Sequence, residues 1–380
     1  MKPERIRISY VIGSLAIGGA ETQLVRLVNG LDRERFDPSI ICLVEGGDLE
    51  GTVARDVPVA KPSGDTPATK GARRSITVGR RALSILVGEL LRRRPDVVHA
   101  YLPAGYVPAG LVGWCLQVPV IVAGRRGFSA GRFGTVWWRT LARLANQAID
   151  VQICNSAALR EVTVADERVE RERTRVIYNG IDVPQLNRVD LPFEMASSDP
   201  QAVMVANFIP YKGHVHVLQA AAKAVQGHPR FRIVLIGDGP QRPTLERLTA
   251  DLGLREHVVF AGPRRDAAEL MKGFDFSILG SSEESFPNAV MESMAVAVPV
   301  ISTRVGGVTE LVDDRVHGLL IPFGDVQAMA EAIAWMLDHP DERRRMGDAG
   351  RRRIAADFST ERMVAQTEAV YEEALTRRSR

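Results

Sequence analysis

The sequence predicts an α/β fold with two doubly wound parallel sheets, one in each half of the chain. Short runs rich in valine and isoleucine alternate with helical patterns over most of the sequence, which is typical of parallel sheets covered by helices on both faces. This alternation pauses at the proline-containing stretch Val183–Pro200 and then restarts. A chain of 380 residues is long enough for two such domains, each with its own core.

Six short apolar runs in the first half are predicted to be strands. They are Arg5–Ile12, Pro38–Val44, Asp96–His99, Pro119–Ala123, Val151–Cys154 and Arg175–Tyr178. Helical patterns separate them, as in Glu21–Leu31, where apolar residues recur every three or four positions. We therefore expect residues 1–183 to form a first domain and residues 184–200 to form a linker.

Five further runs in the second half are predicted to be strands. They are Ala202–Ala206, Phe231–Ile236, Val258–Ala261, Phe274–Leu279 and Val300–Ser302. The tail reads as consecutive helices at Ala328–Leu337, Glu342–Ala356 and Thr360–Leu375. We expect residues 201–357 to form the second domain and residues 358–380 to form a helix that returns to the first domain.

The same sequence excludes several classes of protein. It contains no uninterrupted run of about 18 apolar residues, and its N-terminus reads as a first strand rather than a signal peptide. Cys42, Cys115 and Cys154 are odd in number and lack metal-binding spacing, which is typical of reduced thiols in the cytoplasm. His214 and His216 have no third ligand beside them, so no metal site is expected.

The segment Glu284–Glu292 gives the strongest indication of a binding site. It follows a predicted strand and opens a helix, and ligands bind at the carboxyl ends of strands in open parallel sheets. Pro287 suits the first turn of that helix, whose free N–H groups can meet a phosphate, and Glu292 can accept hydrogen bonds from a ribose diol. By themselves, however, two such glutamates are more often solvated surface acids.

Two other turns place glycine or lysine at the end of a predicted strand. Ala206–Gly213 puts Lys212 beside a glycine, where charge and close backbone approach can clamp a phosphate. Gly18 and Gly19 close the first strand and open a helix, which leaves room for a phosphate at the backbone N–H groups. Each turn alone is also compatible with an ordinary surface turn.

Taken together, these segments resemble glycosyltransferase family 4, a group of retaining enzymes with the GT-B fold. The resemblance covers nearly the whole chain and is densest between Ala202 and Asp325. It implies two Rossmann-like domains that face each other across a cleft. The matching features are Glu284 and Glu292 with seven residues between them, the Gly18-Gly19 loop, the Asn179–Asp182 segment, and Gly306-Gly307 before Glu310.

The resemblance also implies roles for individual residues. Glu284 would bind a hydroxyl of the donor sugar, Glu292 the ribose, and Lys212 the departing diphosphate. Retention in this family is attributed to front-face attack without a protein nucleophile, so Glu284 and Lys212 are the expected catalytic residues. The other residues expected around the donor are Gly18, Gly19, Asn207, Phe260, Gly262, Phe286, Pro287 and Asn288.

Two positions depart from the pattern of the family. Many members have an arginine where this chain has Asn207, so Lys212 acts on the diphosphate alone or another arginine takes that place. Many also have a histidine after the fifth strand, where this chain has Arg126, which can supply the missing charge or bind an anionic acceptor. His99 is expected near the acceptor, with a purely structural role as the alternative.

Positive charge is concentrated in the first half of the chain. Residues 1–190 contain 27 lysines and arginines against 20 acidic residues, although the whole chain has a net charge of only +3. Lys70–Arg94 contains eight basic residues and one acid among apolar residues, and aromatic residues alternate with arginines at 128–139. This pattern suits either an anionic membrane surface or a core helix with a solvated basic face. No nucleic-acid-binding module accompanies the charge, so nucleic acid is not an expected partner.

The expected function is retaining glycosyl transfer in polysaccharide biosynthesis. We expect a nucleotide diphosphate sugar as donor, a UDP-sugar ahead of a GDP-sugar, and a lipid-linked or surface-polysaccharide glycan as acceptor. The sequence lacks an Asp-x-Asp pair, so we expect a metal-independent reaction without a further cofactor. The expected location is the cytoplasm, at the inner face of the cytoplasmic membrane.

Two other functions stay open at this point. A nucleotide-sugar epimerase or hydrolase of the same fold would convert the donor without an acceptor. A catalytically silent subunit would bind a sugar nucleotide or a glycan and form no product, but such a protein would be free to lose Glu284, Glu292 and Lys212.

Overall fold

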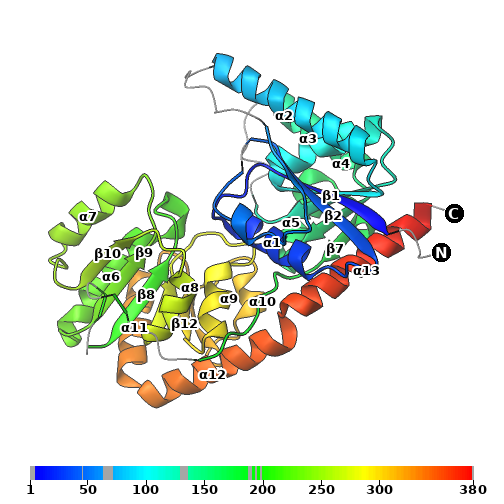
Figure 1. Cartoon of the computed structure of the whole chain (residues 1–380). Helices are drawn as coiled ribbons and strands as arrows, with labels where there is room; N and C mark the ends of the chain where they lie inside the picture. Colours follow the sequence, from blue (N-terminus) through cyan, green and yellow to red (C-terminus); the bar gives the residue numbers. More distant parts are fainter. Residues whose placement is uncertain are drawn as a thin grey trace. The chain divides into compact units, whose positions relative to one another are not determined.

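The computed structural model describes residues 5–44, 46–62, 72–128, 136–186, 191–192, 195–196 and 199–378. The chain forms two compact units (Figure 1). Unit 1 comprises Met1–Gly180 and Thr360–Arg380, and unit 2 comprises Ile181–Ser359. The predicted domain ends at residues 183 and 357 lie close to these limits. Lys70 and residues 129–135, which belong to the two basic segments, lie outside the described residues.

Unit 1 is built on a seven-stranded parallel sheet in the order β3-β2-β1-β4-β5-β6-β7. The pairing of β1 runs from Ile6 opposite Phe36 to Ile12 opposite Cys42 on one side, and β4 pairs on its other side. The strands are β1 (Ile6–Ile12), β2 (Phe36–Cys42), β3 (Val59–Ala60), β4 (Val97–Tyr101), β5 (Val120–Arg125), β6 (Val151–Cys154) and β7 (Thr174–Val176).

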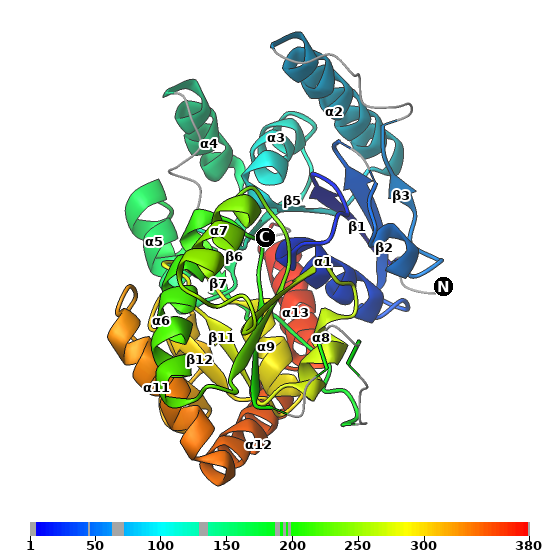
Figure 2. The ribbon, with the colours of Figure 1, turned by 90° about the vertical axis from the view of Figure 1, so that its left-hand side faces the viewer.

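Helices cover both faces of this sheet (Figure 2). The N-terminal strand explains why, since Ile8, Tyr10 and Ile12 belong to one buried apolar cluster and Val11 belongs to the other. One cluster includes α1 (Gly19–Gly30) and the C-terminal helix α13 (Thr360–Arg378), and the other includes α2 (Ala72–Arg93), α3 (Leu102–Cys115) and α4 (Val136–Ala148). Helix α5 (Ala157–Glu167) connects β6 to β7.

Unit 2 has a six-stranded parallel sheet in the order β10-β9-β8-β11-β12-β13. Its strands are β8 (Gln201–Val205), β9 (Arg232–Ile236), β10 (Val258–Gly262), β11 (Phe276–Leu279), β12 (Val300–Thr303) and β13 (Gly318–Ile321). Apolar clusters lie on both of its faces. The helices are α6 (His214–Gly227), α7 (Arg242–Asp251), α8 (Ala267–Leu270), α9 (Asn288–Ala295), α10 (Val308–Leu311), α11 (Val326–Asp338) and α12 (Pro340–Asp357).

The fold class predicted from the sequence is confirmed, and every predicted strand is present with ends shifted by a few residues. Two strands were not predicted. Strand β3 has two residues, too few to show a period, and β13 is a four-residue run that begins with a glycine. Strand β13 begins at Gly318, where a side chain would overlap the backbone of Val300 in the neighbouring strand.

Part of the predicted linker at 184–200 belongs to the core of unit 2. Met195 is fully buried there, and Leu191 packs against the same apolar cluster, which also contains Phe274 and Val298. Residues 187–190, 193–194 and 197–198 lie outside the described residues. Two isolated apolar residues leave no periodic pattern, so the sequence does not distinguish this stretch from a free linker.

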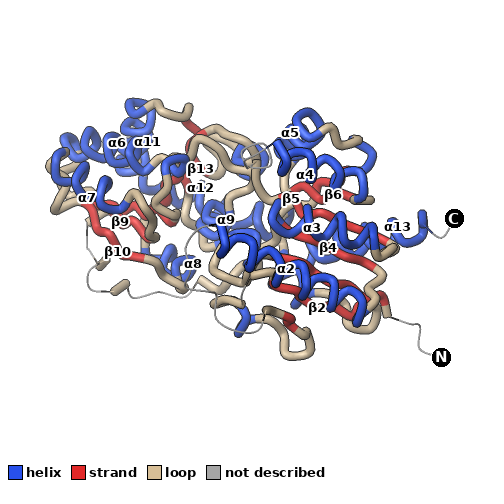
Figure 3. The backbone as a smooth tube through the Cα atoms, turned by 90° about the horizontal axis from the view of Figure 1, so that it is seen from above, coloured by secondary structure: helices blue, strands red, loops and turns tan. Residues whose placement is uncertain are grey.

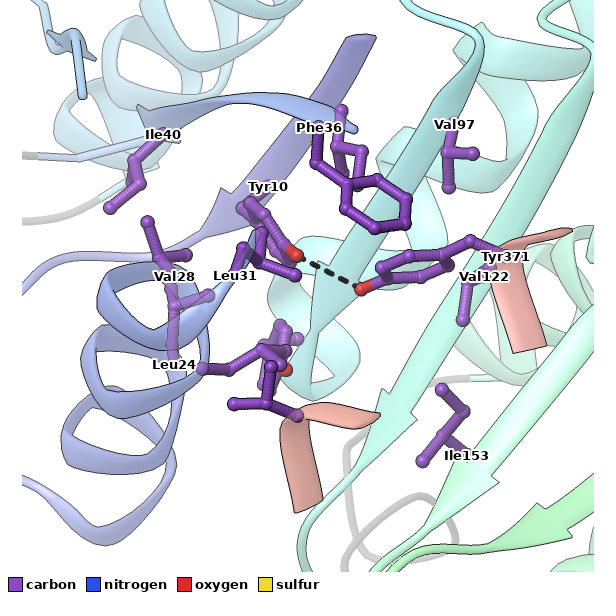
Figure 4. Packing of buried hydrophobic residues seen from close by; sticks show 14 of the residues in the cluster. Tyr10, Leu24, Val28, Leu31, Phe36, Ile40, Val97, Val122, Ile153 and Tyr371 are labelled. Atoms are coloured by element: carbon purple, nitrogen blue, oxygen red, sulfur yellow. Dashed lines mark hydrogen bonds between the residues drawn. The ribbon is translucent and has the colours of Figure 1, made fainter. Parts of the chain in front are cut away.

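Three buried polar side chains, Tyr10, His99 and Tyr371, join the C-terminal helix to the sheet of unit 1. Figure 4 shows the contact between Tyr10 and Tyr371. The hydroxyl groups of Tyr10 and Tyr371 lie 3.0 Å apart, and Nδ1 of His99 lies 2.6 Å from the Tyr371 hydroxyl. The His99 ring also stacks on Tyr101. Burial raises the pKa of Tyr10 and of Tyr371, and burial and the positive charge of Arg126 lower the pKa of His99 well below its usual value.

We expect His99 to make unit 1 less stable at acidic pH. The unfolded chain binds a proton at this histidine below about pH 6.5, whereas the folded chain keeps it neutral, so stability is complete above that pH and is lost as the pH falls. Between about pH 7.5 and pH 5.5 the loss is roughly 1.4 kcal/mol. Denaturant unfolding should show a weaker pH dependence for His99→Gln. Tyr371→Phe, which keeps the histidine, should be less stable but retain the wild-type pH dependence.

The turn between β8 and α6 depends on a glycine. Gly213 has a φ of +74°, and a methyl group there would overlap the carbonyl oxygen of Gly280 after β11. Gly253, at the end of α7, has a nearly identical φ of +71°, but no atom lies within 4 Å of the place a methyl group would occupy. A side chain at Gly253 would therefore cause backbone strain alone, whereas a side chain at Gly213 would cause both backbone strain and steric overlap.

We expect Gly213→Ala to lower the free energy of unfolding much more than Gly253→Ala does. Both substitutions cost about 1–2 kcal/mol for a left-handed backbone. The overlap with Gly280 should lower the stability of the Gly213 variant by at least about 2 kcal/mol more. Denaturant unfolding measures this difference, and equal midpoints for the two variants would show that the turn adapts without cost.

Candidate active site

The carboxyl ends of the strands in unit 2 meet at one edge of the sheet, and the chain order reverses between β8 and β11. The chain continues from β8 to β9 and β10 on one side, and from β11 to β12 and β13 on the other. Such a reversal is a topological switch point, where open α/β sheets bind their ligands. The loops after β8 and β11 carry Lys212 and Glu284, the two residues predicted to be catalytic.

Lys212 and Glu284 form an ion pair at this switch point. Nζ of Lys212 donates to Oε1 of Glu284 at 2.6 Å, and the Ser281 hydroxyl donates to the same oxygen at 2.7 Å. The Lys212 side chain is 18% exposed and the Glu284 side chain 10% exposed, so water screens the pair only weakly. Two donors on Oε1 fix the orientation of the carboxylate, and neither of them uses Oε2.

Backbone and hydroxyl hydrogen bonds tie the loops around this pair together. The Ser282 N–H donates to the Tyr211 carbonyl at 2.8 Å, which joins the loop after β11 to the loop after β8. The Gly307 N–H donates to the Glu284 carbonyl at 3.0 Å, and the Thr303 hydroxyl donates to the Ser281 carbonyl at 2.5 Å. The end of β12 therefore supports the Glu284 loop from the other side, so the ion pair is preorganised.

Helix α9 begins directly after the Glu284 loop. Its N-terminus is the positive end of the helix dipole, an arrangement that suits a phosphate. Pro287 is the N-cap, with φ −74° and ψ 118°, so its predicted position in the first turn is wrong by one residue. The fixed φ of proline fits both the N-cap and the first helical residue, so only the ψ angle distinguishes these two positions. Phe286 is buried against Phe358, while Asn288 and Glu292 are half-buried on α9.

The residues predicted to bind the nucleobase lie at the neighbouring strands. Phe260 is half-buried on β10 and packs edge-on against Phe208, and the Arg242 guanidinium lies 5.9 Å from the Phe260 ring centre. Gly262 ends β10 with a φ of +71°, and its carbonyl accepts from Gly237 at the end of β9. These contacts form an aromatic and cationic surface at the same edge of the sheet as the ion pair.

Asn207 lies in the loop after β8, and His214 is the first residue of the following helix α6. Asn207 is exposed, whereas His214 is buried edge-on against Phe208. Burial and the charge of Lys212 lower the pKa of His214 to about 4, so the imidazole is neutral at pH 7 and adds no charge beside Lys212. His216 packs instead against Phe323. Among the residues that the structure describes, no group of three metal-ligating side chains is present.

The remaining predicted residues belong to unit 1. Gly18 is the N-cap of α1, which begins at Gly19, so these glycines open a helix as predicted. A side chain at Gly18 would meet the Glu21 carboxylate, and burial raises the pKa of Glu21. Because the other donor residues lie in unit 2, a contribution of Gly18 and Gly19 to the same site stays a prediction.

The two residues predicted on the acceptor side differ in exposure. His99 is fully buried and bonds to Tyr371, a geometry that fits its alternative structural role. Arg126 follows β5, donates to the Asn179 side chain and lies over the Tyr101 ring, 5.4 Å from its centre. Binding of an acceptor by Arg126 stays a prediction. Asn179 begins the matched segment Asn179–Asp182, so Arg126 is held by a residue of the family pattern.

The structure therefore pairs Lys212 with Glu284 and adds several neighbouring residues that were not predicted. Ser281 donates to Glu284, Thr303 donates to the Ser281 carbonyl, and Phe208 packs against both His214 and Phe260. Ser281 and Thr303 are small polar residues at the ends of strands, and that position was the one signal in the sequence that could have identified them. Phe208 has no such signal, since a buried aromatic residue after a strand reads as core.

Two family models match the chain and together cover most of it. The model described as Glycosyltransferase Family 4 matches residues 17–185. The model described as Glycosyl transferases group 1 matches residues 192–353, which include Lys212, Glu284 and Glu292.

Similar proteins and structures agree with these matches. The chain is 28% identical over 350 residues to the lipopolysaccharide core biosynthesis glycosyltransferase LpsE of Rhizobium meliloti (strain 1021), covering 90% of this chain and 93% of that protein. It is 29% identical over 336 residues to the MMP alpha-(1->4)-mannosyltransferase of Mycolicibacterium hassiacum, covering 82% of this chain and 78% of that protein. Its fold matches that of Anabaena Alr3699/HepE in complex with UDP-glucose, with a TM-score of 0.81, 21% identity, and coverage of 97% and 100%.

The two matches divide between the halves of the chain in the same way as the two sheets do. The fold is the GT-B fold of glycosyltransferases, and the ion pair lies in the part that the group 1 model covers. The chain belongs to glycosyltransferase family 4 and is a glycosyltransferase.

Proposed function

We propose that the protein is a retaining, metal-independent glycosyltransferase that uses a nucleotide diphosphate sugar. The observation that carries this proposal is the preorganised pair of Lys212 and Glu284 at the switch point of unit 2. A lysine held by a carboxylate provides a cation for a departing diphosphate, and the helix N-terminus at Asn288 provides N–H donors. Such donors can replace the metal that an Asp-x-Asp pair would hold, and the sequence lacks that pair.

The donor that we propose is a UDP-sugar, with no additional cofactor. The structure of Anabaena Alr3699/HepE in complex with UDP-glucose supports this choice. In this chain Glu284 would accept a hydrogen bond from a sugar hydroxyl, and Glu292 would accept from the ribose. The base would lie beside Phe260 and Gly262, where Arg242 adds a cation.

The reaction that fits these residues is a front-face displacement. The bond between the anomeric carbon and the diphosphate oxygen breaks, and the acceptor hydroxyl attacks from the same face. Its proton passes to the departing phosphate oxygen, so no side chain has to act as nucleophile. Lys212 stabilises the negative charge that develops on the diphosphate, while Glu284 orients the sugar.

The acceptor that we propose is a lipid-linked or surface-polysaccharide glycan. The name of the Rhizobium meliloti protein, a lipopolysaccharide core biosynthesis glycosyltransferase, supports a role in polysaccharide biosynthesis. Arg126 is the proposed contact for an anionic group of this acceptor. Such an acceptor would place the protein in the cytoplasm, at the inner face of the cytoplasmic membrane. Within the described part of the chain, none of the helices has the length and apolar character needed to span a bilayer.

We expect Lys212→Ala to lower kcat by about 10²–10³-fold, because it removes one preorganised donor to the leaving group. A transfer assay with UDP-sugars and a glycan acceptor measures this loss. Lys223→Ala is the matched control, since Lys223 bonds to Gln327 on the surface of unit 2, and it should keep wild-type turnover. Equal activity of the Lys212 and Lys223 variants would remove Lys212 from the reaction.

We expect Glu292→Gln and Glu284→Gln to have different effects on binding. Glu292→Gln should weaken UDP binding by about tenfold or more, because hydrogen bonds to a charged acceptor are lost. Glu284→Gln should lower transfer by a larger factor than it lowers UDP binding, since this carboxylate contacts the sugar and also orients Lys212. Calorimetric titration with UDP, GDP and intact UDP-sugars measures both. Tighter binding of GDP than of UDP, or donor breakdown at full rate without acceptor, would contradict the proposal.

A further inference from the structure

The two faces of the sheet in unit 1 carry helices of very different charge. Helices α2, α3 and α4 lie side by side on one face and pack on a single apolar cluster (Figures 2 and 3). Together these three helices contain eight arginines and one acidic residue, Glu89. Helices α1 and α13 on the opposite face contain four arginines and five acids. The excess positive charge of unit 1 therefore belongs to one layer, which we call the α2–α4 layer.

The α2–α4 layer also exposes large apolar side chains. Trp114, at the end of α3, is 66% exposed, and Leu91 of α2 is 56% exposed. Leu83 lies two turns before Leu91 on α2, and Leu141 and Leu144 are exposed one turn apart on α4. Among the residues that the structure describes, α1 and α13 expose no large apolar side chain. Apolar exposure and positive charge thus coincide on the same layer.

Arginines lie next to these apolar side chains. Arg80 is exposed one turn before Leu83, and Arg139 and Arg143 are exposed beside Leu141 and Leu144. The single acid, Glu89, is paired with Arg92 at 2.5 Å and is therefore neutralised. The exposed charges of α2 near Leu83 are therefore arginines, whereas the α4 arginines also line a pocket with Asp166 and Glu167 of α5.

We propose that the α2–α4 layer is the surface by which the protein docks on an anionic phospholipid bilayer. Leucine and tryptophan side chains enter the interface of a bilayer, while the surrounding arginines bind its anionic headgroups. The choice of a bilayer rests on the proposed function, because a lipid-linked acceptor lies in a membrane. The chemistry of the layer supports a bilayer independently of that function. Nucleic acid offers no apolar region for Leu83, Leu91 and Leu144. A second copy of the protein would bring two arginine-rich surfaces together, and these would repel each other.

Docking through this layer involves no residue of the ion-pair site. The layer lies in unit 1, whereas Lys212 and Glu284 lie in unit 2. Substitutions on α2 or α4 should therefore change lipid binding without changing nucleotide binding. This separation allows the docking surface and the proposed reaction to fail independently of each other.

The test is flotation of the full chain with vesicles of phosphatidylcholine alone and of phosphatidylcholine with phosphatidylglycerol. We expect flotation only with phosphatidylglycerol, and less of it as salt increases. Neutralising one arginine on each outer helix, in Arg80→Gln/Arg139→Gln, should lower the partition coefficient by about 30-fold. Leu83→Gln/Leu91→Gln should lower it by at least about tenfold.

Matched control variants lie on unit 2. Arg344 and Arg345 are each 74% exposed on α12, so Arg344→Gln/Arg345→Gln removes the same charge from another surface. Val316 is 50% exposed, so Val316→Gln is the control for loss of an apolar side chain. Both controls should float like the wild type. Thermal unfolding midpoints identify any variant that fails to fold.

Three results would overturn the docking surface. They are failure of the wild type to float with phosphatidylglycerol, equal loss of flotation in the controls, and a dimer in light scattering that the α2 and α4 substitutions abolish. UDP titration and transfer to a water-soluble glycan, measured on the same proteins, keep the two proposals apart. Transfer without flotation refutes only the docking surface, and flotation without nucleotide binding refutes only the proposed reaction.

Discussion

The contact on which the candidate site depends is the ion pair between Lys212 and Glu284. It lies where β8 and β11 become neighbours, so it joins the two halves of the unit 2 sheet at the position where the chain order reverses. The hydrogen bonds from Ser281, Ser282 and Gly307 all serve to hold one of its two loops. A partly buried ion pair contributes little to the free energy of unfolding. It does, however, fix the direction in which each of the two charged side chains points. The site is therefore rigid before any ligand arrives.

Much of this arrangement could be predicted from the sequence. Alternating strands and helices indicated two parallel sheets, and glycine, lysine and glutamate at strand ends indicated one edge of the second sheet. Both conclusions depend on patterns among residues that are neighbours in the sequence, and one sequence is enough to show such patterns. What could not be predicted is which strands are neighbours and how loops bond across them. Ser281 and Thr303 show this limit, because their function depends on Glu284 and on the adjacent strand rather than on their own surroundings.

His99 shows the same limit. The sequence left two roles open for this histidine, near an acceptor or purely structural, and its ring is buried against Tyr371 of the C-terminal helix, a contact that fits the structural role. That contact joins residues 272 positions apart, and no local pattern announces it. The two faces of the same sheet also differ in charge, and this contrast depends on which helices cover which face.

The return of α13 to unit 1 has a consequence for the way the protein is made. Unit 2 is a continuous piece of chain and can complete its core as soon as residue 359 has left the ribosome. Unit 1 cannot do so, because Tyr10 and His99 meet Tyr371 only after the whole of unit 2 has been synthesised. The core of unit 1 is thus completed only after the segment that forms unit 2 has been made. During synthesis, the face of the first sheet that α13 covers remains exposed and in need of protection from premature association.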